Sequence, residues 1–213
     1  MTGVSVRAML VSAGVGITVF LVLAVLVALG WAPLDTVDAH GVVAVHGWLI
    51  GPSRVVTTLG SPLGVDIAAA VAAVGFLLAR RVRAAVVIVV ARLGELGTET
   101  IAKAVIDRAR PVFAHPIAVA GGSSFPSGHT AGSAALYGTL ALLCVPLLAR
   151  WPRVVVTAVV VLFVLAVGMS RVTLGVHYPS DVVGGLVLGL VWATGTVAVA
   201  EEMSRRAGNR VVP

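Results

Sequence analysis

The chain has 213 residues, of which 59% are hydrophobic and only 11% are charged, and its mean hydropathy is +1.07. Soluble domains carry far more charge, so this composition excludes an ordinary soluble protein and indicates a membrane protein. The formal net charge is +6. The basic residues lie between apolar runs and form no stripe with interleaved aromatic residues, which argues against nucleic-acid binding. The single cysteine, Cys144, excludes an intrachain disulfide.

The apolar residues form runs of about twenty, the length of a helix that crosses the hydrocarbon core of a bilayer. We therefore expect an all-α, polytopic membrane protein with six transmembrane helices in one domain, residues 1–213. The first run is too long for the apolar core of a signal peptide and is interpreted as a retained helix. The expected spans are residues 9–29, 63–79, 84–105, 128–149, 154–170 and 182–200.

The connection between the first two spans, residues 31–62, contains Gly, Pro, Asp and His and is predicted to be an outer loop. Its apolar part, residues 42–50, is expected to lie along the membrane interface. The spacing of Asp35, Asp38 and Asp66 fits no cation-binding loop, so these residues are interpreted as solvated loop residues.

Most arginines fall on one side of the membrane if six helices alternate in direction. Lys and Arg are enriched in short cytoplasmic loops, so this side is predicted to be the cytoplasm. Both termini would then be cytoplasmic, in a plasma (inner) membrane, and the other ends of the helices would face outside. The arginines on the predicted cytoplasmic side are Arg7, Arg80, Arg81, Arg83, Arg150, Arg153, Arg205, Arg206 and Arg210.

Three polar segments interrupt the apolar sequence: residues 103–111, 125–129 and 170–181. Ionisable groups at membrane depth are costly and usually mark a function. The third and fifth predicted spans end at these segments, and the fourth and sixth spans begin there. Alternation places those four ends on one membrane face, so the polar segments are expected to form one pocket.

The expected pocket combines cations with groups that exchange protons near neutral pH. Arginine presents a planar fork that matches phosphate oxygens, lysine adds a point charge, and histidine acts as acid or base. Ser127 and Gly128 lie at the start of the fourth span, where free backbone N–H groups and the helix dipole favour an anion. The pocket is therefore suited to a phosphate. Its charged and titratable members are Lys103, Arg110, Arg171, His129, His177 and Asp181.

These residues fall into three ordered blocks with fixed spacing. The blocks are Lys103 with Arg110 and Pro111, then residues 126–129 with the sequence Pro-Ser-Gly-His, then Ser170 and Arg171 with His177 and Asp181. The tripartite pattern resembles the signature of the type 2 phosphatidic acid phosphatase family, and no block departs from it. The resemblance covers roughly the second half of the chain, with the motifs inside residues 103–181.

The resemblance implies a six-helix fold and a metal-independent phosphatase that needs no cofactor. It implies that His177 attacks phosphorus, that Asp181 holds its imidazole, and that His129 protonates the leaving oxygen and later activates water. A nucleophile with an orienting carboxylate four residues away also follows the general logic of catalytic triads. The residues implied to bind the phosphate oxygens are Lys103, Arg110, Ser127, Gly128 and Arg171.

Further charged and small residues lie outside the signature. Arg108 is a candidate for an additional substrate contact, or else a surface arginine that faces lipid headgroups. Four charged residues recur every three or four positions and are predicted to form a buried ladder of ion pairs on one helix face. The ladder consists of Arg92, Glu95 and Glu99 and leads to Lys103, the fourth residue of the face. A proton path along it is the disfavoured alternative. The residues Gly184, Gly185 and Gly189 are expected to allow close helix packing.

The predicted function is dephosphorylation of a lipid phosphate or diphosphate at the outer leaflet through a phosphohistidine intermediate. A polyprenyl (undecaprenyl-type) diphosphate is the preferred substrate, with phosphatidic acid or phosphatidylglycerol phosphate as the alternative. The expected partners are this lipid substrate and the surrounding membrane lipids. A transporter or channel is disfavoured because the polar groups lie at helix ends and not at the membrane midplane. Vanadate-dependent haloperoxidases have a similar site, but six membrane spans argue against that chemistry.

Overall fold

The structure is a computed structural model, and it describes residues 5–113 and 116–208. All regular secondary structure in these residues is helical. The helices are α1 (Val6–Ala28), α2 (Ala32–Val45), α3 (Ile50–Leu59), α4 (Pro62–Leu78), α5 (Val82–Ile106), α6 (Gly128–Cys144), the 3-10 turn η1 (Val145–Leu147), α7 (Arg150–Thr173) and α8 (Pro179–Arg206).

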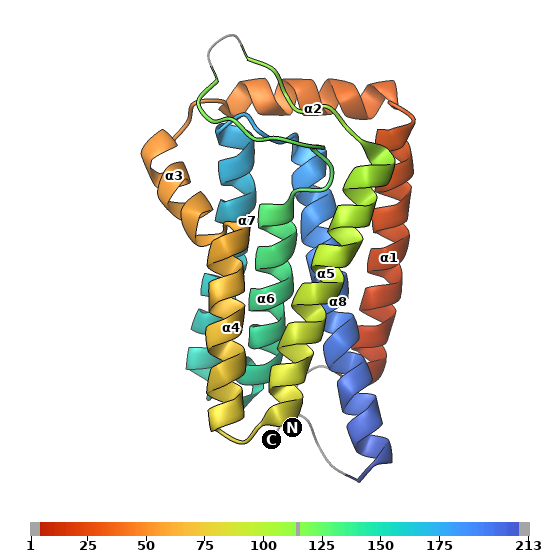
Figure 1. Ribbon diagram of the computed structural model, residues 1–213, viewed down its shortest axis with the longest axis vertical. Coiled ribbons are helices and arrows are strands. Elements are labelled where there is room, and N and C mark those ends of the chain that lie inside the picture. The colour runs from red at the N-terminus through yellow and green to blue at the C-terminus, as the bar shows by residue number, and fades with distance from the viewer. Residues whose placement is uncertain (1–4, 114–115, 209–213) are drawn as a thin grey trace.

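Six long helices form an elongated bundle, and α2 lies across one end of it (Figure 1). The six bundle helices, α1 and α4 to α8, match the positions of the six expected spans within a few residues. The all-helical membrane fold is therefore confirmed. By length and hydropathy alone, four helices of the described chain qualify as spans: α1, α6 with η1, α7 and α8. The number of six crossings stays a prediction, because α4 has only 17 residues and α5 carries several charges.

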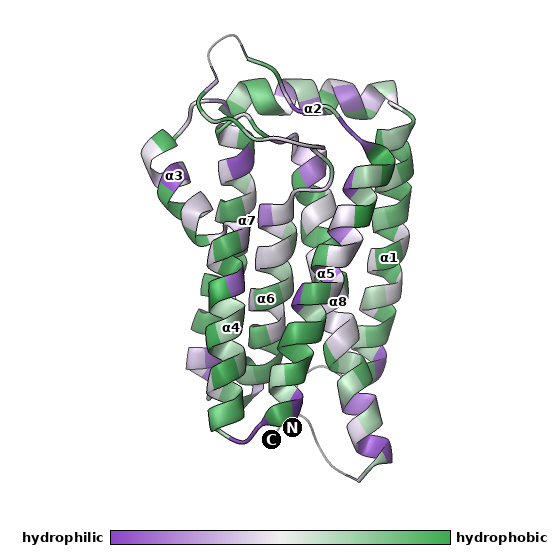
Figure 2. Cartoon of the chain, viewed as in Figure 1, coloured by the Kyte–Doolittle hydropathy of each residue, from purple (hydrophilic) through white to green (hydrophobic). Residues whose placement is uncertain are grey.

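The surface of the bundle explains why the chain belongs in a bilayer. Large apolar side chains such as Leu21, Val71 and Leu162 are exposed along its length. Figure 2 shows the middle of the bundle as mainly hydrophobic, whereas hydrophilic residues gather in α2 and the connections at one end and in the last turns of α8 at the other. An apolar belt between two polar ends is the pattern of an integral membrane protein.

Residues 31–62 were predicted to form a loop, which was wrong because most of the segment is helical. Its position outside the membrane stays a prediction. This segment forms α2 and α3, which meet at a bend of 115°. The prolines and glycines that suggested a loop lie at the ends of helices. Pro33 is in the first turn of α2, Gly47 has a positive φ in the connection to α3, and Pro62 starts α4. Neither helix is long enough to produce an apolar run of twenty residues, which explains the missed assignment.

Two aspartates were also assigned wrongly as solvated loop residues. Asp38 lies in α2 and is only 1% exposed. Asp66 lies in α4, and its carboxylate is 2.7 Å from the Nε of Arg92 on α5. Each has a cationic partner on another segment, Arg108 after α5 for Asp38 and Arg92 for Asp66, and a scan for local ligand spacing does not detect such a partner.

The helix α6 is the buried centre of the bundle, and glycines on α8 let the two backbones approach. A side chain at position 185 would collide with the carbonyl oxygen of Ser127, and one at Gly189 would collide with that of Ala131. Gly184 similarly leaves room for the ring of Phe125. A Cβ at position 184 would lie only 2.5 Å from the nearest ring atom. Close approach through small residues is how membrane helices gain packing contacts. As a result, the first turns of α6 and α8 lie side by side.

The charged face of α5 forms ion pairs inside the bundle. Arg92 contacts Glu95 at 2.5 Å, and Glu99 contacts Lys103 at 2.6 Å. Glu95 is fully buried and Arg92 is 5% exposed. The predicted ladder therefore consists of two separate pairs, with Asp66 from α4 as a third carboxylate at its lower end.

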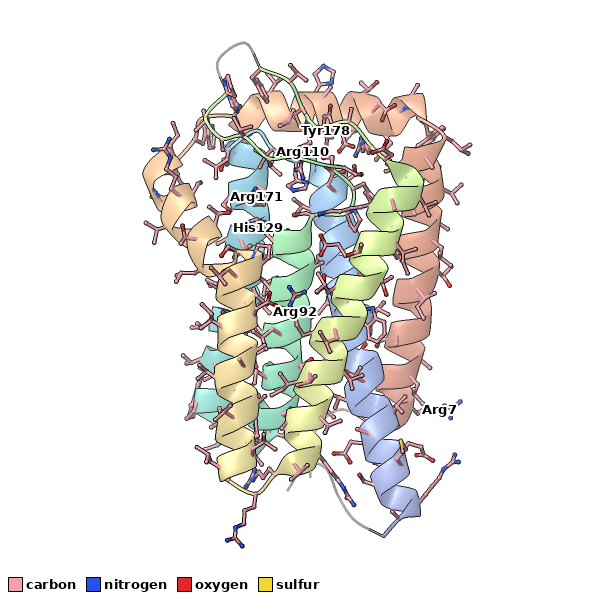
Figure 3. All side chains as sticks on the ribbon, in the orientation of Figure 1. Arg7, Arg92, Arg110, His129, Arg171 and Tyr178 are labelled. Atoms are coloured by element: carbon pink, nitrogen blue, oxygen red, sulfur yellow. The ribbon has the colours of Figure 1, made fainter. Side chains whose placement is uncertain are left out.

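The arginines predicted to be cytoplasmic lie together at one end of the bundle, opposite α2. The connections from α4 to α5 and from α6 to α7 are at this end, as are the start of α1 at Val6 and the end of α8 at Arg206 (Figure 1). Arg7 is labelled there in Figure 3. Arg210 lies outside the described residues.

We predict that Gly189→Ala destabilises the protein more than Gly195→Ala on the same helix. A Cβ at position 189 meets the Ala131 backbone, which is unable to move aside, whereas one at position 195 meets only Ala13, at 3.9 Å. Overpacking of this kind costs about 1–3 kcal/mol. Thermal unfolding in detergent, followed by circular dichroism, measures the difference. Equal midpoints for the two variants would show that α6 and α8 do not depend on this contact.

Candidate active site

The three predicted motifs converge at the end of the bundle that α2 covers. Figure 3 shows Arg110, His129, Arg171 and Tyr178 gathered there, with Arg92 much further down. Backbone hydrogen bonds join the segments: Ser127 N–H donates to Asp181 O at 2.9 Å, and Ser124 N–H donates to Arg108 O at 2.8 Å. The connection from α5 to α6 is thus fixed to the start of α8.

The start of α8 follows the usual pattern of a helix N-terminus. Tyr178 is the N-cap, Pro179 occupies the first helical position and Asp181 the third. The Oδ2 of Asp181 accepts a hydrogen bond from the Tyr178 N–H at 2.8 Å. An acidic group here also interacts favourably with the helix dipole. Local helix capping thus places the Asp181 carboxylate beside the residue that precedes the helix, His177.

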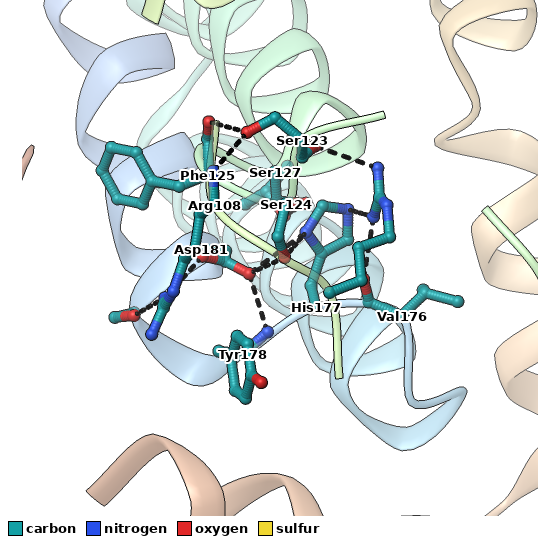
Figure 4. Close-up of polar contacts among 12 residues, drawn as sticks. Arg108, Ser123, Ser124, Phe125, Ser127, Val176, His177, Tyr178 and Asp181 are labelled. Atoms are coloured by element: carbon teal, nitrogen blue, oxygen red, sulfur yellow. Dashed lines mark hydrogen bonds and ion pairs between the residues drawn. The ribbon is translucent and has the colours of Figure 1, made fainter. Parts of the chain in front are cut away.

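The two ring nitrogens of His177 have different surroundings (Figure 4). Nδ1 lies 3.4 Å from Asp181 Oδ2 and 3.5 Å from Ser124 Oγ, and Nε2 lies 3.0 Å from Arg110 Nη1. Because Arg110 can only donate, the Nε2 lone pair must accept, and the ring proton is assigned to Nδ1, facing Asp181. The side chain is 2% exposed. This tautomer places the lone pair of the ring on Nε2.

Burial dominates the ionisation of His177. It lowers the pKa of the imidazole from 6.5 to about 4, and the neighbouring Asp181 carboxylate opposes this shift only in part. The positive charges of Arg110 and Arg171 lower the pKa further. His177 is therefore neutral at physiological pH, the form that a nucleophile requires.

The carboxylate of Asp181 is fully buried and accepts from several donors. Oδ1 receives Arg108 Nη1 at 2.7 Å. Oδ2 receives the Ser124 hydroxyl as well as the Tyr178 N–H. A buried carboxylate needs such partners to remain charged. Asp181 is thus held on both oxygens in addition to its contact with His177.

Arg110 is bound by backbone carbonyl groups and has no carboxylate partner among the described residues. Its Nη1 donates to Val176 O at 2.8 Å, and its Nη2 donates to Gly121 O at 3.0 Å and to Ser123 O at 3.2 Å. Partial burial lowers the pKa of its guanidinium. These contacts hold a full positive charge against Nε2 of His177.

Arg171 comes from the last turn of α7 and is 7% exposed. Its Nη1 donates to the Thr57 hydroxyl of α3 at 2.6 Å, while its buried Nε has no hydrogen-bond partner within the described part of the chain. Lys103, at the end of α5, is paired with Glu99 at 2.6 Å. Among the described residues, no carboxylate forms a salt bridge with either arginine of the motifs, whereas the lysine is paired.

The second motif forms the N-terminus of α6. Ser127 is fully buried, and its hydroxyl accepts from Thr130 at 3.1 Å. Gly128 lies against the carboxylate of Glu99, which occupies the space that a Cβ would need. His129 is partly buried and lies near Arg171 in Figure 3. The helix start thus lies among the cations of the other two motifs.

Arg108 lies inside a network and does not face lipid headgroups. Its Nη1 donates to Asp181 and its Nη2 to Asp38 at 2.8 Å, and the guanidinium stacks 4.3 Å from the centre of the Tyr178 ring. Burial alone would lower the pKa of Arg108, but the carboxylates of Asp181 and Asp38 raise it overall. A substrate contact by Arg108 stays a prediction.

Three residues at the site were missed in the sequence. Ser124 precedes the second motif by two residues and has no local pattern of its own. Asp38 and Thr57 contact residues 142 and 114 positions away, respectively. The signal that identifies Asp38 is its burial on an otherwise exposed helix, and burial is not visible in the sequence.

The fold and the site together define a helical membrane protein with two histidines and several cations at one end. The PAP2 superfamily model matches residues 82–204, more than half of the chain. The chain belongs to the PAP2 superfamily, which confirms the family that the three motifs predicted.

Solved structures and curated proteins agree with this family. The crystal structure of a transmembrane PAP2 type phosphatidylglycerolphosphate phosphatase from Bacillus subtilis superposes with a TM-score of 0.77 at 25% identity, over 91% of this chain and 98% of that one. LpxE of Aquifex aeolicus superposes with a TM-score of 0.59 at 20% identity, over 78% of this chain and 95% of that one, and supports the fold alone.

Two curated relatives come from Bacillus subtilis (strain 168). Phosphatidylglycerophosphatase B is 44% identical over 89 residues, which are 40% of this chain and 43% of the relative. Undecaprenyl-diphosphatase BcrC is 37% identical over 86 residues, which are 38% of this chain and 40% of the relative. The chain thus spans about two fifths of the length of these relatives.

We predict that His177 makes stability depend on pH between about 4 and 6.5. The folded pKa is lowered to about 4, so the unfolded state binds more protons in this window and stability falls as pH drops through it. The loss amounts to on the order of 3 kcal/mol. Unfolding midpoints across this window should fall more steeply for the wild type than for His177→Asn, which lacks the titrating group. Parallel curves would contradict the lowered pKa.

Proposed function

We propose that this protein hydrolyses a lipid phosphate or diphosphate through a phosphohistidine formed on His177. The observation that carries the proposal is the geometry of the His177 ring, with Nδ1 directed at Asp181 and Nε2 directed at Arg110. The names of the Bacillus subtilis relatives, a phosphatidylglycerophosphatase and an undecaprenyl-diphosphatase, agree with this chemistry.

In the first step, Nε2 of His177 donates its lone pair to phosphorus. The bond between phosphorus and the leaving oxygen breaks, and the protonated imidazole of His129 gives its proton to that oxygen. Asp181 stabilises the positive charge on the ring through Nδ1. The lipid leaves as an alcohol from a monophosphate, or as a lipid monophosphate from a diphosphate.

In the second step, His129 is neutral and takes a proton from water. The oxygen of this water attacks phosphorus, the bond between phosphorus and Nε2 breaks, and inorganic phosphate is released. His177 returns to the neutral form that its buried environment favours. His129 is again protonated and ready for the next substrate.

Cations and backbone N–H groups stabilise the charge that spreads over the phosphoryl oxygens in both steps. Arg110 and Arg171 are suited to this role, because neutral groups hold them and their charge remains available. Lys103 and the N-terminus of α6, at Ser127 and Gly128, complete the proposed phosphate site. These groups supply positive charge where many phosphoryl-transfer enzymes use a metal ion, so we propose a metal-independent reaction.

We propose a polyprenyl (undecaprenyl-type) diphosphate as the substrate, because a lipid with a small phosphate headgroup reaches the site from within the membrane. Phosphatidylglycerol phosphate is the second candidate. It is favoured by the relative named phosphatidylglycerophosphatase B and by the structural match with the phosphatidylglycerolphosphate phosphatase. Both substrates would present a phosphate at the same depth, so the polar site alone does not discriminate between them.

We propose that the site faces outward in the plasma (inner) membrane. The support is the distribution of arginines, since those between α4 and α5 and between α6 and α7 lie at the opposite end of the bundle. Short loops rich in arginine remain in the cytoplasm. Phosphate would then be released on the external side.

We predict that the purified protein in detergent releases phosphate from a lipid phosphate in the presence of chelator, and that His177→Ala and His129→Ala abolish this release. Loss of the nucleophile should lower kcat about 10³-fold or more. His40→Ala is the control, because His40 is exposed on α2 and its ring forms a hydrogen bond with the backbone of Thr36, one turn earlier on the same helix. Folding of each variant is checked by its unfolding midpoint.

The substrate arms are a polyprenyl diphosphate, phosphatidylglycerol phosphate, phosphatidic acid and a soluble phosphate ester. Wild-type rates in folded His177→Ala would contradict the mechanism. A higher kcat/KM for the soluble ester than for every lipid would contradict the substrate class. Release from none of the four, combined with ion flux in liposomes, would favour a transporter.

We predict that the acid limb of kcat/KM lies near pH 4, because the reaction needs neutral His177 and its pKa is lowered to about 4. Arg110→Gln removes a nearby positive charge, so it should raise the pKa of His177 and move the limb to higher pH. Arg54→Gln, which changes an exposed arginine of α3 at the same end, should leave the limb in place. A limb near pH 6.5 in the wild type would contradict the lowered pKa of His177.

A further inference from the structure

Asp38 is a buried carboxylate on a helix that is otherwise largely exposed. It is 1% exposed, whereas Asp35, one turn earlier on α2, has a side chain that is 50% exposed. Burying a carboxylate is unfavourable unless donors replace the lost water. The contacts of Asp38 therefore indicate what fixes α2 to the rest of the molecule.

The donors to Asp38 come from the first turn of α8 and from the connection after α5. Its Oδ1 accepts the Ser180 N–H at 2.9 Å, and its Oδ2 accepts the Ser180 hydroxyl and Arg108 Nη2 at 2.8 Å. The Ser180 N–H is one of the free donors at a helix start. Asp38 thus caps α8 from a different helix, directly beside Asp181.

Arg108 links Asp38 to the carboxylate that faces the nucleophile. The same guanidinium donates through Nη2 to Asp38 and through Nη1 to Asp181, at 2.7 Å. Nη1 also donates to the Ser180 hydroxyl at 2.7 Å, and the Tyr178 ring covers one face of the guanidinium. Two carboxylates and a ring leave Arg108 with a single orientation, and this orientation determines where Asp181 Oδ1 lies.

We propose that Asp38 is a positioning residue for the reaction at His177. Through Arg108 and Ser180 it fixes the carboxylate of Asp181, which holds the His177 ring, and it keeps α2 against the site. This inference rests on the proposed phosphatase function. The family match begins at residue 82, so Asp38 lies outside the matched segment. The N-terminal part of the chain therefore contributes to the chemistry as well as to the membrane anchor.

The experiment compares Asp38→Asn with Asp35→Asn. Both changes remove one carboxylate from α2, and both native carboxylates contact Arg108, but Asp35 does so at 3.4 Å and from an exposed position. We expect Asp38→Asn to lower kcat about 10- to 100-fold with KM within about threefold, because misplacement of a catalytic group slows the chemical step. Asp35→Asn should stay within about twofold of the wild type. Equal kcat for the two folded variants would overturn the proposal.

A double-mutant cycle separates positioning from simple docking of α2. Because Asp38 acts partly through Arg108, Asp38→Asn combined with Arg108→Gln should lower kcat by less than the product of the two single effects. Effects on kcat that multiply would overturn the proposal. If Asp38→Asn does not fold, Ser180→Ala replaces it, since this change removes one contact to each partner and leaves every charge in place. We then expect kcat to fall about 3- to 10-fold, and a wild-type kcat would overturn the proposal.

Wild-type protein and His177→Ala are assayed in parallel with these variants. Inactive wild type, or active His177→Ala, would contradict the proposed function itself. An active wild type with inactive His177→Ala and fully active Asp38→Asn would contradict only the role of Asp38. The two conclusions therefore fail in different ways.

Discussion

The site depends on the close approach of α6 and α8 at their first turns. Glycine at position 185 removes the side chain that would collide with the Ser127 carbonyl, and the Ser127 N–H then reaches the Asp181 carbonyl at 2.9 Å. Two helix N-termini are thereby brought together, so the positive ends of two dipoles and several free N–H groups meet at one place. Such a place favours anions. It explains why carboxylates from α2, α5 and α8 gather there and why a phosphate is a suitable ligand.

The low dielectric of a bilayer makes the pairing of charges informative. Lys103 is paired with Glu99, and Arg108 is paired with Asp38 and Asp181. Arg110 and Arg171 instead donate to carbonyl oxygens and to a threonine hydroxyl, so their contacts satisfy hydrogen bonds without neutralising charge. The position of an arginine in a motif does not reveal this difference. The structure divides the basic residues of the site into those that contact a carboxylate and those that neutral groups hold.

The fold could be read from the sequence where one physical rule determined the outcome. Apolar runs of about twenty residues located the six bundle helices, and alternation of their directions predicted that residues 103–111, 125–129 and 170–181 would meet. The same rule failed for residues 31–62, because α2 and α3 have only 14 and 10 residues and each is too short for such a run. Asp38, Thr57 and Ser124 were missed for a related reason. Each of these residues contacts a partner on a distant segment, and the local spacing of residues in the sequence does not predict that contact.

The N-terminal helices and the matched segment both contribute residues to the site, and the motifs alone do not show the N-terminal contribution. The matched segment supplies the histidines, the cations and Asp181. The preceding helices supply Asp38, which neutralises Arg108, and Thr57, which holds Arg171 without neutralising it. The first contact keeps one arginine in the framework, and the second leaves another arginine charged and oriented. Because a buried guanidinium takes the orientation that its acceptors impose, the N-terminal helices orient two arginines that the matched segment provides, one inside a motif and one outside it.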